Sequence, residues 1–156
     1  DNGQVSRDNF AGEFLLDVIV PYELTMVLAR QQNGRLRRVV NIGSQYGTVA
    51  ANTRLYDNPV MQSPPHYSVA KAALAHLTKE LAVRLAPDEI QVNCIAFGGV
   101  EGRADEEFRK RYASLCPQGR MLSEDEVARP VDLLLSGGFS AMTGHVLAVD
   151  GGWTAW

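Results

Sequence analysis

RVVNIGS, at residues 38–44, is the stretch of this sequence that decides the fold. A short run of β-branched residues ended by a glycine and a hydroxyl is typical of a strand buried in a parallel sheet. The run IQVNCIAF at 90–97 and the shorter run VLAV at 146–149 have the same character, and a glycine pair follows each of them closely. We therefore predict three strands, the first of which places Ser44 at its carboxyl end.

Helical patterns separate these strands. Apolar residues recur at helical spacing over residues 11–32, with an interruption expected near Pro21 and an end at Asn33-Gly34. A second helix is expected to begin near Pro64-Pro65 and to run to about residue 86. Its apolar stripe consists of Leu74, Leu77, Leu81 and Leu85.

Two further helices are expected at residues 104–114 and 123–136, and the second opens with SEDE at 123–126 in the form of a capping box. Residues 45–65 are rich in turn formers, so we expect them to lie outside the core and to frame a substrate. Strands that alternate with helices imply a parallel sheet with right-handed crossovers. The sequence predicts one α/β domain over residues 1–156, with no internal repeat and no linker.

The composition argues against several classes of function. The chain has 156 residues, of which 46% are hydrophobic and 21% charged, and a formal net charge of −3 gives no reason to expect nucleic acid or an anionic membrane as a partner. We find no apolar run of membrane-spanning length and no basic and apolar leader, so the expected location is cytoplasmic. Cys94, Cys116 and the three histidines form no pattern typical of a metal site or a disulfide framework.

The strongest chemical signal is YSVAK at residues 67–71, which sets a phenol and an ammonium four residues apart in the second helix. Side chains at positions i and i+4 share one helical face. A positive charge beside a phenol stabilises the phenolate, which makes the tyrosine usable as an acid and a base near neutral pH. An amphipathic helix can carry this spacing by chance, so the pair needs support from the rest of the chain.

That support comes from the order of the surrounding motifs. They are VNIGS at 40–44 with Gly47, YSVAK, VNCI at 92–95, GRM at 119–121, Thr143-Gly144 and VDGG at 149–152. In this order the chain resembles the carboxyl-terminal half of the short-chain dehydrogenase/reductase family. The long insertion between the serine and the tyrosine, and the ending at residues 150–156, are similar to a subgroup associated with bacterial surface-sugar and flagellin-glycan biosynthesis.

The resemblance implies a three-layer Rossmann-like fold and hydride transfer between NAD or NADP and an alcohol or carbonyl carbon. Tyr67 would exchange the proton, and Lys71 would hold the nicotinamide ribose and stabilise the phenolate. Ser44 would hydrogen-bond the substrate oxygen. Its alternative role is only to end the strand or to cap a turn. The family also implies a small-molecule substrate, with a sugar derivative as one candidate, and a homo-oligomer, either a dimer or a tetramer.

The nicotinamide carboxamide would meet the backbone that follows the second strand, at Phe97, Gly98 and Val100. The glycines here could alternatively be simple turn glycines. For Gly151-Gly152 a turn is the better interpretation, and Asp150 beside them is expected to be structural.

Three departures from the family pattern bear on function. An alignment on Pro21 puts Asp17 where the family has a catalytic asparagine, so the amide donor is lost and a negative charge comes near the phenol. Phe97 stands where the family usually has proline, which alters the stiffness of the loop. The glycine-rich phosphate-binding motif is absent, so we expect only about three strands, with an open apolar edge along the strand of Ser44, and a chain that is part of a longer or split protein.

Two other functions remain open. Given the missing cofactor half and Asp17, the chain could be a truncated non-catalytic remnant or a subunit that works by association. A serine hydrolase built on Ser44 has little support, because GSQYG at 43–47 is not G-x-S-x-G and no triad order is evident.

Overall fold

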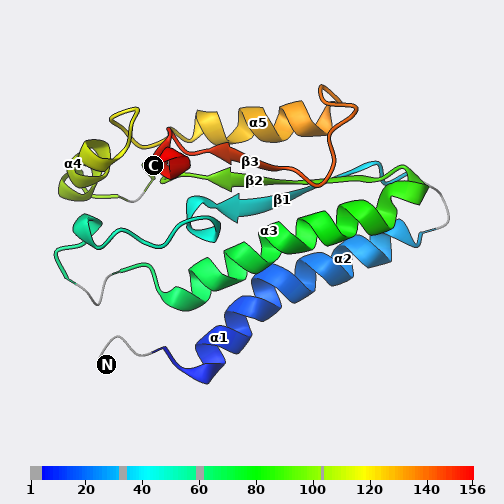
Figure 1. The fold of residues 1–156 in the computed structure, drawn as a ribbon, viewed down its shortest axis with the longest axis horizontal. Helices are drawn as coiled ribbons and strands as arrows, with labels where there is room; N and C mark the ends of the chain where they lie inside the picture. The colour runs from blue at the N-terminus through cyan, green and yellow to red at the C-terminus, as the bar shows by residue number, and fades with distance from the viewer. Residues whose placement is uncertain (1–4, 32–34, 59–61, 103) are drawn as a thin grey trace.

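A computed structural model describes residues 5–31, 35–58, 62–102 and 104–156 (Figure 1). Three parallel strands form one sheet in the order β1-β2-β3: β1 is Arg38–Ser44, β2 is Gln91–Phe97 and β3 is Val146–Val149. Ser44 at the end of β1 lies opposite Phe97 at the end of β2. The three predicted strands are confirmed, and β1 forms an open edge within the described part of the chain.

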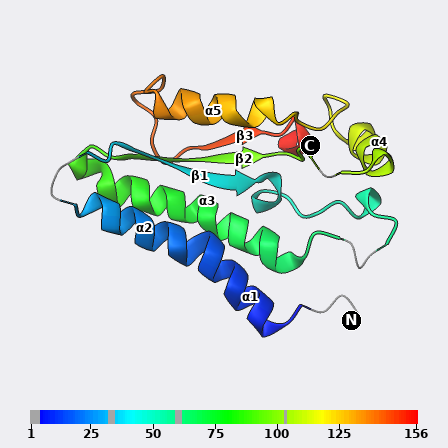
Figure 2. The same ribbon diagram turned by 180° about the vertical axis from the view of Figure 1, so that it is seen from behind.

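Helices cover both faces of the sheet, which confirms the three-layer α/β fold (Figure 2). Helices α2, Val20–Ala29, and α3, Pro65–Leu85, lie on one face, whereas α5, Asp125–Leu135, lies on the other. Helix α4, Glu106–Leu115, lies beyond the carboxyl ends of the strands. The residues at the carboxyl ends of the strands therefore lie at the edge of the sheet nearest α4.

The first helix differs from the prediction at both its start and its middle. It begins as α1 at Arg7–Phe14, where the Ser6 side chain accepts a hydrogen bond from the Asn9 N–H, and it continues into α2 without a break. A π-helical turn, Leu15–Ile19, joins the two. The expected end at Asn33-Gly34 lies outside the described residues.

Pro21 explains why this π-helical turn forms where an interruption was expected. Proline has no N–H to donate to the carbonyl of Asp17, and its ring crowds that carbonyl. The helix widens ahead of the proline, and the Val20 N–H bonds the Leu15 carbonyl five residues back instead of four. The chain thus absorbs Pro21 by changing the winding of the helix rather than by ending it.

Helix α3 packs on the sheet through the predicted stripe. Leu74, Leu81 and Leu85 are buried, and Leu77 is half-buried. A polar tie joins the same helix to β1: the Asn41 side-chain amide donates to the Thr78 hydroxyl at 2.9 Å, and that hydroxyl donates to the Leu74 carbonyl at 2.9 Å. Because the tie is buried and its hydrogen bonds are made, it fixes the position of α3 along the strand.

The segment at 45–65 is not entirely outside the core, which corrects the expectation from its composition. Leu55, in the 3₁₀ turn Thr53–Leu55, is fully buried and packs in one cluster with Tyr112 of α4 and Trp153. The Arg111 side chain holds the same turn by donating to the Leu55 carbonyl at 2.8 Å. Helix α4 supplies the apolar partner that turn-forming residues do not reveal.

The start of α5 keeps half of the predicted capping box. The Glu126 carboxylate reaches back and accepts from the Ser123 N–H at 2.9 Å, as expected. The Ser123 hydroxyl donates to the same carboxylate at 3.2 Å instead of accepting from the helix, and Arg120 binds both Glu126 oxygens at 2.7 Å. Glu126 is therefore the centre of the cap.

Candidate active site

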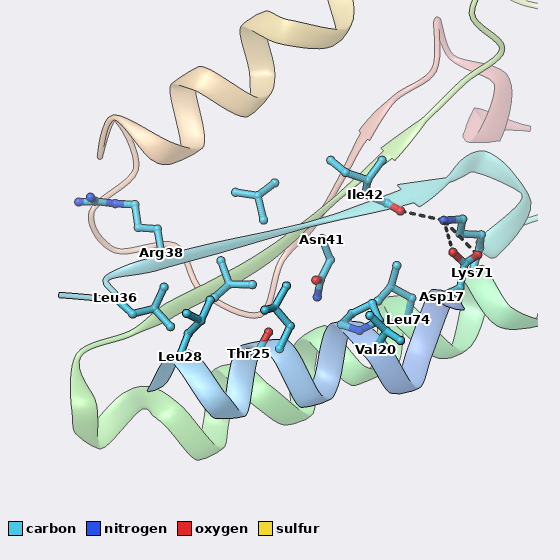
Figure 3. A pocket seen from close by; sticks show the side chains of 14 residues that line it. Asp17, Val20, Thr25, Leu28, Leu36, Arg38, Asn41, Ile42, Lys71 and Leu74 are labelled. Atoms are coloured by element: carbon cyan, nitrogen blue, oxygen red, sulfur yellow. Dashed lines mark hydrogen bonds and ion pairs between the residues drawn. The ribbon is translucent and has the colours of Figure 1, made fainter. Parts of the chain in front are cut away.

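The carboxyl edge of the sheet gathers the residues singled out from the sequence. Ser44 ends β1, and Phe97, its register partner, ends β2. From α3, the Lys71 ammonium donates to the Ile42 carbonyl at 3.1 Å, so it reaches the same end of β1 (Figure 3). Open parallel sheets bind their ligands outside this edge.

Asp17 and Lys71 form an ion pair between the π-helical turn and α3 (Figure 3). Asp17 Oδ1 accepts a hydrogen bond from Lys71 Nζ at 3.1 Å, and Oδ2, also 3.1 Å from Nζ, is held by charge alone. The two side chains are only 20% and 13% exposed. The structure therefore brings Asp17 into the same cluster as Lys71, although the two are far apart in the sequence.

Tyr67 lies beside this pair, one helical turn before Lys71. The Lys71 ammonium is 5.6 Å from the centre of the Tyr67 ring, which is within the range of a cation–π contact. Tyr67 is half-buried. The four-residue spacing thus places the two side chains on one face of α3, as predicted.

Ser44 caps the turn that follows β1. Its hydroxyl oxygen accepts from the Tyr46 N–H at 3.2 Å, which directs the hydroxyl hydrogen away from that amide. The turn Gln45–Gly47 then packs against α3, where a Cβ added to Gly47 would lie 2.9 Å from the Lys71 carbonyl oxygen. Gly47 is therefore a glycine because the turn approaches the backbone of α3 at Lys71.

Gly98 and Gly99 are also required by close approach rather than by a turn. Neither has a positive φ, and a Cβ added to Gly99 would lie 2.7 Å from the ring of Tyr112. Gly151 and Gly152, in contrast, have φ values of +66° and +88°, which confirms them as turn glycines.

Asp150 has the structural role expected of it. Its carboxylate accepts from the Gly152 N–H at 2.9 Å and from the Thr154 N–H at 3.0 Å. These bonds hold the turn that carries Trp153 into the core.

The backbone after β2 is held by a bridge between Val100 and Leu122. The Gly99 carbonyl accepts from the Leu122 N–H at 2.8 Å, and the Glu101 N–H donates to the Leu122 carbonyl at 2.9 Å. In such a bridge the backbone groups of the central residue point to the opposite side. Those of Val100 therefore face away from Leu122.

Tyr112 and Gln45 are buried residues of this region that the sequence did not single out. The Tyr112 hydroxyl donates to the Gln45 side-chain oxygen at 2.9 Å and accepts from the Gly99 N–H at 2.8 Å. Its ring stacks on Trp153 with 4.4 Å between ring centres, and burial raises the pKa of Tyr112 to about 12. The sequence carried one signal of this contact, the pair Gly98-Gly99. Two residues without side chains leave room for a bulky neighbour, but they do not show which residue fills that room.

His66 contacts the first helix. Its Nε2 is 3.8 Å from a Glu13 carboxylate oxygen, and its ring meets Phe10 edge-on at 5.8 Å.

Burial raises the pKa of the Cys94 thiol to about 11, so this thiol stays protonated at neutral pH. Across the described residues we find no group of three His, Cys, Asp or Glu side chains that could hold a metal ion, and no helix long and apolar enough to cross a membrane.

A parallel α/β/α sheet with charged and hydroxyl side chains at its carboxyl edge defines a Rossmann-like protein. Residues 32–154 match a family model described as enoyl-(acyl carrier protein) reductase. The chain belongs to the short-chain dehydrogenase/reductase family.

Individual relatives agree with this assignment. The chain is 32% identical over 136 residues to the post-translational flagellin modification protein A of Campylobacter coli, covering 87% of this chain and 52% of the relative. It is 36% identical over 124 residues to a galactitol 2-dehydrogenase of Rhizobium johnstonii, covering 76% of this chain and 45% of the relative.

A solved structure extends the similarity to nearly the whole chain. A short chain dehydrogenase from Leptospira borgpetersenii, crystallised with bound NAD⁺, superposes with a TM-score of 0.88 at 31% identity, covering 97% of this chain and 58% of that chain. The chain thus spans about half the length of the curated relatives it matches.

Proposed function

We propose that this chain is the catalytic part of an NAD(P)-dependent dehydrogenase/reductase that interconverts an alcohol and a carbonyl compound. The observation that carries the proposal is the cluster at the carboxyl edge, in which Lys71 lies beside Tyr67 and at the end of the Ser44 strand. Membership of the family and similarity to a dehydrogenase with bound NAD⁺ support the same activity.

In this proposal each side chain has a separate task. Tyr67 donates a proton to the carbonyl oxygen in reduction and accepts it from the hydroxyl in oxidation. The Lys71 ammonium favours the anionic form of the phenol while the proton is away. The Ser44 hydroxyl, which points away from the Tyr46 amide, donates to the substrate oxygen and steadies its charge.

The residues present fit a nicotinamide cofactor. Lys71 supplies an ammonium for ribose hydroxyls, and the backbone groups of Val100, turned away from Leu122, suit a carboxamide that needs one donor and one acceptor. Phe97 and Gly98 lead the chain to that point. When bound, NAD(P) would supply or accept the hydride.

We propose a small polyhydroxylated alcohol or a related sugar derivative as the substrate, handled by a homo-oligomer in the cytoplasm. The similarity to a galactitol dehydrogenase and to a flagellin modification protein supports this class of substrate.

We also propose that residues 1–156 form one unit whose open edge is completed by the rest of a longer or split protein. A groove of about 420 Å³ runs between α2 and β1, with Asp17 and Lys71 at one end and mostly apolar side chains elsewhere (Figure 3). Val20, Leu24, Leu28 and Ile42 line it and are between 38% and 57% exposed. Apolar exposure on this scale next to an open strand edge favours a partner that adds a strand.

The same groove favours a second candidate function, in which the chain is a non-catalytic subunit that works by association. Titration of the 156-residue chain with NADH, followed by the fluorescence of the reduced nicotinamide, separates the two. Tight binding by this chain alone would count against the associating subunit.

Tyr67→Phe in the longest natural polypeptide that contains this sequence tests the proposed activity. The variant keeps the ring beside Lys71 but has no proton to exchange, so we expect turnover of NAD(P)H to fall at least about a hundredfold. Far-ultraviolet circular dichroism and the thermal midpoint should stay unchanged, and Tyr22→Phe on the exposed side of α2 is the matched control. Wild-type turnover in Tyr67→Phe would overturn the proposal.

A further inference from the structure

The Tyr112 hydroxyl joins the segment that follows β1 to the segment that follows β2. Ser44 and Phe97 are the last register partners of β1 and β2. Beyond them the Gly98 N–H donates to the Val149 carbonyl of β3 at 2.9 Å, so this residue is tied to β3 and not to β1. Just beyond this point Tyr112 bonds Gln45, the neighbour of Ser44, and Gly99, the neighbour of Val100. The contact therefore joins the segments that follow the two strands.

Both bonds of this hydroxyl have a single possible direction. The Gly99 N–H can only donate, so the Tyr112 oxygen must accept from it. The hydroxyl hydrogen is then left for the Gln45 side-chain oxygen, 2.9 Å away. Since Tyr112 is 2% exposed and Gln45 is 3% exposed, water does not compete for these bonds.

The ring of Tyr112 has equally little freedom. One face stacks on Trp153, at an angle of 20° between the ring planes. The ring also lies so close to Gly99 that a Cβ added there would be 2.7 Å from it. A Cβ added to Gly98 would lie 3.0 Å from the Tyr112 hydroxyl and 2.7 Å from the Asp150 Cα. The position of the hydroxyl is thus set by packing, and the two segments are fixed relative to it.

We propose that Tyr112 is a positioning residue that sets the spacing between the Ser44 hydroxyl and the Gly98–Val100 backbone. This rests on the proposed function, in which Ser44 meets the substrate and Val100 meets the nicotinamide. Helix α4, through Tyr112, then determines how far the reacting carbon of the substrate lies from the hydride carrier.

Tyr112→Phe tests the proposal because it removes one oxygen and keeps the stacked ring. In the 156-residue chain without cofactor, we expect the Gly99 amide to exchange its hydrogen about tenfold faster by NMR, which corresponds to the loss of one buried hydrogen bond. Tyr22→Phe, an exposed tyrosine on α2, is the control and should leave Gly99 unchanged. Unchanged exchange at Gly99 in Tyr112→Phe would overturn the proposal.

The kinetic arm uses the longest natural polypeptide, at a temperature where the variant is fully folded. We expect Tyr112→Phe to lower kcat/KM about tenfold, with part of the change in the KM for the cofactor, since the carboxamide contact shifts. If Tyr112 had a merely structural role, the variant would have a lower thermal midpoint, but kcat/KM and the cofactor KM of the folded enzyme would equal those of the wild type. That result would overturn the proposal.

Gln45→Met gives a second route to the same contact if Tyr112→Phe does not fold. It leaves the Tyr112 hydroxyl without its acceptor while keeping the side-chain length. The kinetic losses of the two variants should not add in the double variant, because both act on one contact, whereas additive losses would count against it. If the wild type has no NAD(P)H turnover, the proposed function fails, while the exchange comparison still decides whether Tyr112 ties the two segments together.

Discussion

The Lys71 ammonium donates hydrogen bonds both to a carboxylate and to a backbone carbonyl near the end of a strand. It bonds Asp17 at 3.1 Å and the Ile42 carbonyl at 3.1 Å, and the Ile42 carbonyl lies in the groove along the open edge of β1. A cofactor ribose would have to take over part of these contacts. Asp17 therefore has the most direct influence on the position of the Lys71 ammonium, because it is the counter-charge of that group.

Asp17→Asn should destabilise the protein by about 1–2 kcal/mol, because the hydrogen bond from Lys71 loses the negative charge of its acceptor. The amide keeps the shape of the carboxylate and one acceptor oxygen, but it leaves a mostly buried ammonium without its counter-charge. Urea unfolding at neutral pH measures the change. Glu23→Gln, on an exposed position of α2, is the control, and equal stability of the two variants would contradict the role given to Asp17.

The elements differ in how far the sequence could predict them. The strands and α3 follow from local patterns, because a buried strand and an amphipathic helix each leave a period in the sequence. The π-helical turn does not, since Pro21 could equally have ended the helix. The burial of Leu55 and the contacts of Tyr112 depend on α4, which is distant in the sequence, so no local pattern could reveal them.

The same limit applies to the candidate site. Ser44, Tyr67 and Lys71 were predicted because each lies in a short motif on a predictable element. The ion pair of Asp17 with Lys71 was not predicted, because it joins two helices whose relative position is set by packing. The resemblance to the family singled out Asp17 as a candidate site residue, and the structure shows that its partner is Lys71.

The cap of α5 gives a pH-dependent prediction. The bidentate hydrogen bond from Arg120, together with the Ser123 N–H, lowers the pKa of Glu126 to about 2. Unfolded glutamate has a pKa of about 4.3, so the cap contributes stability above that pH and loses it as the pH falls towards 2. Both side chains are at the surface, so salt should weaken the effect.

Glu126→Gln should therefore flatten the fall of the thermal midpoint between about pH 4.5 and pH 2, because the variant has no proton to take up at this position. Differential scanning calorimetry across this range compares it with the wild type. Glu124→Gln, an exposed neighbour, should keep the wild-type slope. Parallel curves for the wild type and Glu126→Gln would show that the cap does not contribute.

At the scale of the whole molecule, the helices on the two faces of the sheet cover their apolar side chains to different extents. On the α5 side Val40, Phe97 and Leu134 form one packed cluster. On the α2 side the groove leaves large apolar side chains exposed beside the free edge of β1. A chain built in this way should not stay monomeric when it is alone.

We expect the isolated 156-residue chain to self-associate at tens of micromolar, a range in which exposed apolar surface and unpaired strand edges promote association. Leu24→Lys should shift it towards the monomer, because the ammonium cannot be buried in an apolar contact. Sedimentation velocity at several concentrations measures this. Leu133→Lys on α5, also an exposed apolar position, is the control, and equal association of both variants would place the contact elsewhere.

The π-helical turn also holds one residue more than an α-helical turn would, without changing the direction in which α1 faces. An α-helix closes each hydrogen bond over four residues, whereas the bond from the Val20 N–H to the Leu15 carbonyl spans five, so Leu15–Ile19 takes up one extra residue for nearly the same rotation. Phe10 and Glu13 reach His66 in the present phase. A one-residue deletion in the turn would return it to α-helical winding and leave Phe10 and Glu13 facing His66, so the widened turn holds its extra residue without disturbing the contact of α1 with α3.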